Sequence, residues 1–249
     1  MAEITWKNKS SKEIEGLIIT NTPPITKPKM KVDKIEIDGR DGDIIEKVGY
    51  ESYTKNVGIG LARNYDIDEV IKYFTGDGEL ILSDEPDKVY IASIFDDVDY
   101  ERLLQIRKAT VKFHVQPYKY LKDESKVSLS ITTQTSVEVE NKGLEVSKPI
   151  FMLEGSGTIE IAVNGINIFK YTFPNGENKV IVDSLKEEAY LEGVYKNRNM
   201  LGEFPKLEVG NNTISWTGTL TKIEIEPKSR WLLWLKFMMQ TRDYLTTMD

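Results

Sequence analysis

The side chains best suited to catalysis in this sequence are few. His114 is the only histidine, and the chain contains no cysteine. A serine nucleophile needs a nearby proton acceptor, usually histidine, and sits in a G-x-S-x-G turn in one large class of hydrolases. No such turn occurs in the sequence. We therefore expect His114 to be a surface or interface residue, and we predict that the protein is not an enzyme.

The carboxylates that could bind a metal are most closely spaced at Asp38, Asp41 and Asp43. Their spacing lacks the ligand positions and the closing glutamate of an EF-hand loop. Zinc sites need several histidine or cysteine ligands, which the chain cannot supply. We expect solvated turn residues here, no metal and no other cofactor. Paired carboxylates for glycoside hydrolysis stay open, because 40 acidic residues offer too many combinations.

These aspartates lie inside a longer patterned stretch, from Met30 to Tyr53. Residues Lys31–Asp38 alternate in character, with Ile35 and Ile37 on the same side. A period of two is typical of a half-buried β-strand. Gly39 and Gly42 then predict a turn, because glycine tolerates positive φ. A second extended run follows, so the stretch is either a compact hairpin or a long β-arm.

Composition and charge limit the possible classes of protein. A chain of 249 residues forms one large domain or two ordinary ones. The net charge of −7 argues against a nucleic-acid-binding protein with a basic surface. The N-terminus has no apolar core of signal-peptide length, and no apolar run approaches the roughly 20 residues of a membrane helix. We expect synthesis in the cytoplasm without membrane insertion.

The first half predicts a β-rich domain with a short helix. The helix is expected over Asp66–Gly76, capped by Asp66 with Glu69 three residues later, because its apolar residues share one face. These are Ile67, Val70, Ile71 and Phe74. Asp99–Ile106 fits a helix or a strand. Strands are expected at Ile14–Ile19, Asn56–Leu61, Glu79–Leu82, Val89–Phe95 and Ala109–Val115.

Prolines mark two expected interruptions of these strands. A turn over Ser83–Lys88 is predicted from Pro86, and Pro117 is expected to end the strand that begins at Ala109.

The second half changes character after Tyr118, where residues up to Ser136 become rich in lysine, serine and threonine. We therefore place a domain boundary near residues 120–135, giving domains 1–130 and 131–249. Turn signals are frequent beyond it. Asn164-Gly165 between two apolar runs predicts a hairpin, and many short strands with such turns predict a β-sandwich.

Several motifs together carry a resemblance to a known family. They are Pro23-Pro24, the Asp38–Asp43 loop followed by Tyr50 and Tyr53, residues 76–82, residues 111–120 and Asn141-Lys142-Gly143. In order and spacing this pattern resembles the distal tail proteins of bacteriophages with long non-contractile tails.

The resemblance implies a mainly β fold with two parts. The first is a β-sandwich or split-barrel domain, like that of tail-tube proteins, with one short helix. The second is a galectin-like or carbohydrate-module-like β-sandwich. The resemblance also implies a hub of the phage tail tip, located in the virion, in which a hexameric ring joins the tail tube to the adsorption apparatus and leaves a channel for DNA.

The implied partners are identical copies and other tail components. The latter are the major tail tube protein, the tail-associated hub or lysin protein, the tape measure protein and receptor-binding proteins. Within this picture, we expect contacts between subunits at the turn of the arm and at two nearby tyrosines, because an exposed strand edge can pair across a subunit boundary. These residues are Gly39, Arg40, Asp41, Gly42, Tyr50 and Tyr53.

The C-terminal segment is rich in aromatic residues and has two interpretations. Trp231, Trp234 and Phe237 either pack on their own domain or dock a neighbouring subunit, since interface cores are enriched in aromatic residues. The alternative function is a carbohydrate-binding module for bacterial cell-wall glycans. It would use exposed aromatic side chains of the second half, with Tyr190, Tyr195 and Trp216 as candidates.

Overall fold

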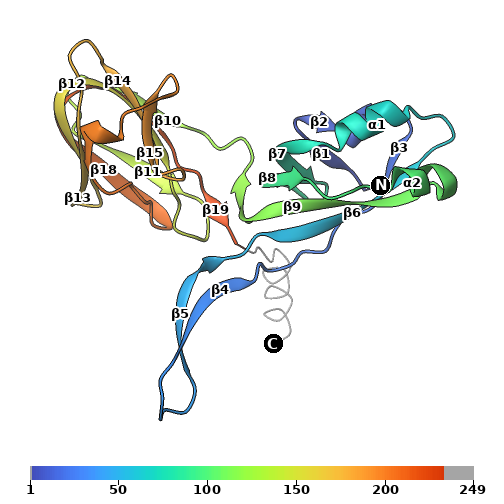
Figure 1. Cartoon of the computed structure of the whole chain (residues 1–249). Coiled ribbons are helices and arrows are strands. Elements are labelled where there is room, and N and C mark those ends of the chain that lie inside the picture. The colour runs from blue at the N-terminus through green and yellow to red at the C-terminus, as the bar shows by residue number, and fades with distance from the viewer. Residues whose placement is uncertain (1, 233–249) are drawn as a thin grey trace, which may run out of the picture. The chain divides into compact units, whose positions relative to one another are not determined.

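The computed structural model describes residues 2–232, which form two compact units, each with its own core. Of these residues, those up to Lys119 and Leu232 belong to the first unit, and Tyr120–Trp231 form the second. Strands dominate both units (Figure 1). The predicted mainly β class is confirmed.

The first unit is built on one sheet whose strands run in the order β2-β1-β7-β8-β9-β6-β3. The pairs β1–β2, β1–β7, β7–β8, β6–β9 and β3–β6 are antiparallel. Strands β4 and β5 lie outside this sheet and form a two-stranded sheet of their own. The bounds are β1 Ile4–Trp6, β2 Lys9–Ser10, β3 Leu17–Asn21, β4 Met30–Glu36, β5 Asp43–Tyr50, β6 Tyr53–Leu61, β7 Gly76–Leu82, β8 Glu85–Ile94 and β9 Lys108–Leu121.

The core of the first unit follows the alternation of its strands. Val111, Phe113 and Val115 on β9 are fully buried, as their period of two predicts. Trp6 of β1 packs edge-to-face on Phe113, with 5.1 Å between ring centroids. The same core takes in Val70 and Phe74, so it joins the sheet to the predicted helix.

Two helices accompany the sheet, where one was expected. Helix α1 spans Ile67–Tyr73, and the predicted cap is confirmed because the Asp66 carboxylate accepts hydrogen bonds from the amides of residues 68 and 69. The predicted face was partly wrong: Ile71 is exposed, whereas Tyr73 is buried. The ambiguous segment is helix α2, Tyr100–Ile106, capped by Asp99. A 3₁₀ turn, η1, spans Ser11–Glu13, so the first expected strand begins only at Leu17.

Both prolines were wrongly taken as strand breakers. Leu82 pairs with Glu85 and Leu80 pairs with Tyr90, so residues 86–89 bulge from the β7 ladder and Pro86 need not donate to it. Strand β9 continues past Pro117 to Leu121. Its pairing with β6 ends at Val115, so β6 requires no amide from Pro117.

The second unit is also a single antiparallel system, centred on two long strands. Its order is β10-β18-β12-β14-β15-β16, with β11 on β18, β13 on β12 and β17 on β13. The bounds are β10 Val127–Ser130, β11 Ser136–Asn141, β12 Ile150–Val163, β13 Ile166–Thr172, β14 Lys179–Asp183, β15 Glu188–Leu191, β16 Val194–Tyr195, β17 Met200–Gly202, β18 Gly210–Glu226 and β19 Arg230–Trp231, with a 3₁₀ turn, η2, at Asn197–Asn199.

Local sequence signals explain much of this unit. The Asn164-Gly165 hairpin is confirmed: both residues have positive φ, 52° and 81°, and Val163 pairs with Ile166 across them. Such a two-residue turn matches the twist of the strands that it joins. Strands β12 and β18 pair with each other, and their residues Phe151, Leu153 and Ile225 are buried in the core of the second unit.

Asn141 closes the loop between β11 and β12. Its side-chain amide donates to the carbonyls of Glu145 and Leu207, at 3.0 and 3.1 Å, and its oxygen accepts from the amide of Gly143 at 2.9 Å. The residue is 1% exposed. Its three hydrogen bonds therefore replace the water that would otherwise be needed by these buried backbone groups.

We predict that Asn141→Ala lowers the free energy of unfolding by about 2 kcal/mol or more, because each buried group left unpaired costs about 1–3 kcal/mol. Urea denaturation measures this. The matched control is Asn211→Ala, at an exposed position of β18, which should change the free energy by less than about 0.5 kcal/mol. Equal effects of the two variants would contradict the assigned role of Asn141.

Candidate functional site

The turn that joins β4 to β5 is open to solvent. Gly39 and Gly42 have φ of 81° and 79°, as their residue type predicts, and no atom lies within 4 Å of the position that a Cβ would take at either residue. The amide of Arg40 donates to the carbonyl of Ile37 at 3.1 Å, which tightens the turn. Arg40 and Asp41 are exposed. The four predicted contact residues thus lie together at the tip of a β-arm.

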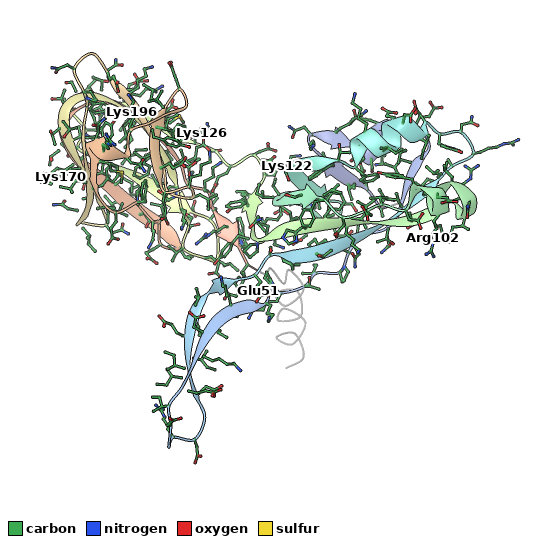
Figure 2. The ribbon with its side chains drawn as sticks, in the orientation of Figure 1. Glu51, Arg102, Lys122, Lys126, Lys170 and Lys196 are labelled. Carbon is green, nitrogen blue, oxygen red and sulfur yellow. The ribbon has the colours of Figure 1, made fainter. Side chains whose placement is uncertain are left out.

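The two strands of the arm are exposed on both faces, contrary to the predicted half-buried strand. Ile45 is 57% exposed, and the other apolar side chains of the arm are also accessible: Ile35, Ile37, Ile44 and Val48. Figure 2 shows side chains projecting from both faces of the arm. Within residues 2–232, β4 and β5 pair only with each other, so each strand keeps one unpaired backbone edge.

The root of the arm is tied to the first unit. The ammonium group of Lys29 lies 3.1 Å from the carboxylate of Glu51, which is labelled at the root of the arm in Figure 2. The ring of Tyr50 packs edge-to-face on Tyr118, with 6.1 Å between centroids. Tyr53 belongs to β6 instead of the arm, and it packs against the core of its own unit. The structure therefore places Tyr50 at the root and Tyr53 inside the sheet, away from the arm tip.

A buried cluster of charged groups lies beneath this root. Lys119 forms an ion pair with Glu85, and both side chains are almost fully buried. The hydroxyl of Tyr90 donates to the same carboxylate. Lys55 is 2% exposed, and its ammonium group donates to the carbonyl of Pro24 at 3.3 Å. Since Pro24 precedes β4, Lys55 holds the segment that leads into the arm.

Burial shifts the pKa of Lys55 and of two neighbouring tyrosines. Loss of hydration lowers the pKa of Lys55 from 10.5 to about 8, with Glu85 opposing the shift and Lys119 adding to it. The Lys55 ammonium lies 4.9 Å from the centre of the Tyr90 ring, which offers a cation–π contact. Burial, followed by the hydrogen bond to Glu85, raises the pKa of Tyr90. Burial also raises the pKa of Tyr53 to about 12.

Sequence reasoning missed this cluster because lysine and glutamate are usually exposed. The signal was nevertheless present in the strand periodicity. Lys55 is in phase with the buried Val57 and Ile59, and Lys119 continues the phase of the buried residues of β9. A period of two, continued through the charged residues, would have placed both lysines inside.

The other predicted residues lie elsewhere. Trp231 is buried within the chain, and Trp234 and Phe237 lie outside the described residues. Trp216 is 6% exposed and belongs to the core of the second unit, so it cannot stack on a sugar. Tyr195 is exposed and Tyr190 is half-buried. Trp216 is therefore excluded as a stacking platform, whereas Tyr195 has the exposure that the carbohydrate-binding alternative requires.

His114, the candidate proton acceptor, belongs to β9 and is half-buried. The ring of His114 packs beside Phe95, with 5.0 Å between centroids. Among residues 2–232, no three His, Cys, Asp or Glu side chains come together as a possible metal site. None of the helices described is long and apolar enough to span a bilayer.

Comparisons with known proteins agree with the predicted resemblance. Residues 7–115 match the family described as the phage tail protein RIFT-related domain. The crystal structure of SPP1 Dit (gp 19.1), titled a paradigm of the hub adsorption apparatus in phages infecting Gram-positive bacteria, superposes with a TM-score of 0.66. It is 17% identical, and the match covers 91% of this chain and 98% of that one. No curated protein matches the chain. The resemblance is thus confirmed as a match of residues 7–115 to a phage tail domain and as a similarity of fold over most of the chain.

We predict that Lys55→Met raises the free energy of unfolding at pH 7 by about 1–2 kcal/mol, because it removes a buried charge and leaves the Glu85–Lys119 pair intact. The unfolded chain binds a proton at Lys55 up to pH 10.5, whereas the folded chain releases it near pH 8. This lysine therefore makes the stability of the native protein rise with pH above about 8.

Urea titrations at pH 7 and pH 9 measure both effects. The stability gained between these pH values should be smaller in Lys55→Met than in the unmodified protein. Lys112→Met, at an exposed position of β9, is the control and should retain the full gain. Parallel pH dependence in all three proteins would rule out a buried, perturbed Lys55.

Proposed function

We propose that this chain is a structural hub of a phage tail tip, because residues 7–115 match the phage tail protein RIFT-related domain. In this proposal, six copies form a ring that joins the tail tube to the adsorption apparatus and leaves a channel for DNA. The observation that carries the proposal is the β4–β5 arm, which has two open backbone edges and apolar side chains on its surface.

The arm has the chemistry of an element that is completed by a neighbour. Unpaired amides and carbonyls on a strand edge form main-chain hydrogen bonds with another strand, and the accessible isoleucines would become buried in the same contact. A contact between two different surfaces of identical subunits closes into a ring when the rotation per subunit permits it. We infer that Gly39, Arg40, Asp41, Gly42 and Tyr50 contribute to such contacts.

If the ring lies between the tail tube and the tail tip, it must contact other tail proteins on both sides. We infer contacts of the ring with the major tail tube protein, the tape measure protein and the tail-associated hub or lysin protein, and contacts of the second unit with receptor-binding proteins. The net charge of −7 per copy supports a channel that does not retain DNA, since like charges repel. The same charge argues against specific binding of nucleic acid.

We predict that Gly42→Val prevents assembly without preventing folding. Valine at φ of 79° is strained by about 1–2 kcal/mol, but the turn is open, so the strain distorts the arm tip and leaves the cores untouched. Electron microscopy of tails made in cells that supply only the variant should show tails without a completed tip. Urea denaturation of the purified variant should still show one cooperative transition, with its midpoint lowered by no more than this local strain accounts for.

Gly176→Val is the matched control, because Gly176 has φ of 84° and equally open surroundings in the second unit. It should carry the same local strain and still assemble. Complete tails with Gly42→Val would count against the arm tip as a contact.

We also predict that Ile45→Lys abolishes assembly, because a buried, unpaired lysine in the arm contact costs several kcal/mol. Ile45 is exposed in the single chain, so the purified variant should fold normally. Ile166→Lys, at a 67% exposed position in the second unit, is the control and should assemble. If both variants form complete tails, the apolar surface of the arm is not an interface.

A further inference from the structure

The dipeptide Asn-Gly occurs twice in the second unit, at Asn164-Gly165 and at Asn175-Gly176. Glycine has no side chain to hinder its own amide nitrogen from approaching the carboxamide carbon of the preceding asparagine. Bonding of that nitrogen to that carbon closes a five-membered ring and releases ammonia. The reaction therefore depends on how firmly the fold holds the carboxamide and the glycine amide, and the two sites differ in this respect.

The carboxamide of Asn164 is held at both of its ends. Its oxygen accepts a hydrogen bond from the amide of Thr213 at 2.9 Å, and its nitrogen donates to the side-chain oxygen of Asn212 at 3.0 Å. Asn212 is itself 1% exposed and is fixed by hydrogen bonds to the backbone of Glu208. The Asn164 carboxamide can turn toward Gly165 only after both of its hydrogen bonds break, which opposes ring closure.

The Asn175-Gly176 site lies in the turn between β13 and β14 and is much less restrained. Both residues are exposed, and within residues 2–232 neither the Asn175 carboxamide nor the Gly176 amide forms a hydrogen bond. Gly176 has φ of 84°, and no atom lies within 4 Å of the position that a Cβ would take there. One hydrogen bond closes the turn, from the amide of Glu177 to the carbonyl of Pro174 at 3.0 Å. The reacting groups can therefore meet at the surface without disturbing the core.

We propose that Asn175 is a site of self-modification, at which the folded protein converts asparagine to aspartate and isoaspartate. The Gly176 nitrogen loses its proton and bonds to the Asn175 Cγ. The bond from Cγ to the carboxamide nitrogen breaks, and ammonia leaves with that proton. Water then adds to either carbonyl of the ring and opens it. The reactants are the chain and water, so the reaction is independent of the tail function proposed above.

The products change the charge and the backbone beside an ion pair. Each product carries one carboxylate more than the original chain, and isoaspartate also routes the main chain through its Cβ. Glu177 follows the modified turn directly, and its carboxylate lies 2.6 Å from the ammonium group of Lys196, the residue that precedes η2. The modification therefore lengthens the backbone at the point where this turn is tied to the segment leading into η2.

The test is a time course of the full chain, incubated folded at pH 8 and, in parallel, unfolded in guanidinium chloride. Mass spectrometry of tryptic peptides follows the two sites separately, because Lys170 lies between them. In the folded protein, Asn175 should convert at least about tenfold faster than Asn164, since ring closure at Asn164 must first break two hydrogen bonds. In the unfolded chain, where these hydrogen bonds are absent, the two rates should become similar. Enzymatic methylation of isoaspartate identifies that product.

Gly176→Ala is the matched variant, because its added methyl group hinders the attacking nitrogen. Conversion of Asn175 in this variant should fall at least about tenfold. Gly193→Ala is the control: Gly193 has φ of 79° and equally open surroundings, but it follows Glu192, so Asn175 should convert at the original rate. The proposal would be overturned by an unconverted Asn175, by equal rates at the two sites in the folded protein, by a rate difference that persists after unfolding, or by full conversion in Gly176→Ala.

Discussion

A two-stranded ribbon cannot satisfy its own outer backbone edges, and this constraint shapes the first unit. An isolated hairpin is marginally stable in water, because it has no sheet to bury a face against. The β4–β5 arm is such a hairpin, with exposed isoleucines on its surface. Its conformation depends on the turn at its tip and on its attachment at the root. At the tip, two glycines adopt the positive φ that the turn requires. At the root, an ion pair and an aromatic contact attach the arm to the first unit.

The root explains why charged groups lie inside the first unit. Burying Lys55, Glu85 and Lys119 costs hydration that apolar residues would not lose, and a buried ion pair seldom adds net stability. These groups instead form hydrogen bonds and ion pairs with defined geometry. The Lys55 ammonium donates to the Pro24 carbonyl, which fixes one point of the chain that enters the arm, and the Glu85 carboxylate is shared by Lys119 and Tyr90. The hydrogen bond to Pro24 has a defined direction, which the hydrophobic effect lacks.

The sequence predicted those elements whose signal is local. The period of two in β9, the Asp66 cap of α1 and the Asn164-Gly165 turn each depend on a few neighbouring residues, and each is present. Pro86 and Pro117 were misread because their effect depends on which neighbouring strand needs an amide at that position, which is a property of the sheet. Tyr53 was assigned to the arm for the same reason: only its pairing with Val115 shows that a new strand has begun. The buried lysine cluster depends on three separate strands, β6, β8 and β9, so no local pattern specifies it completely.

Two turns of the first unit need residues with positive φ, and they use different residue types for it. At the arm tip, positive φ falls on Gly39 and Gly42, where the chain adopts the turn without strain. At the β1–β2 turn, positive φ falls on Lys7 and Asn8, although glycine would relieve the strain at position 7. Gly76 and Gly78 appear on the facing strand, where each leaves room for the lysine stem. A glycine at position 7 would relieve the strain, but it would also remove the stem that packs over Gly78 and the ammonium group that lies 5.5 Å from the centre of the Trp6 ring.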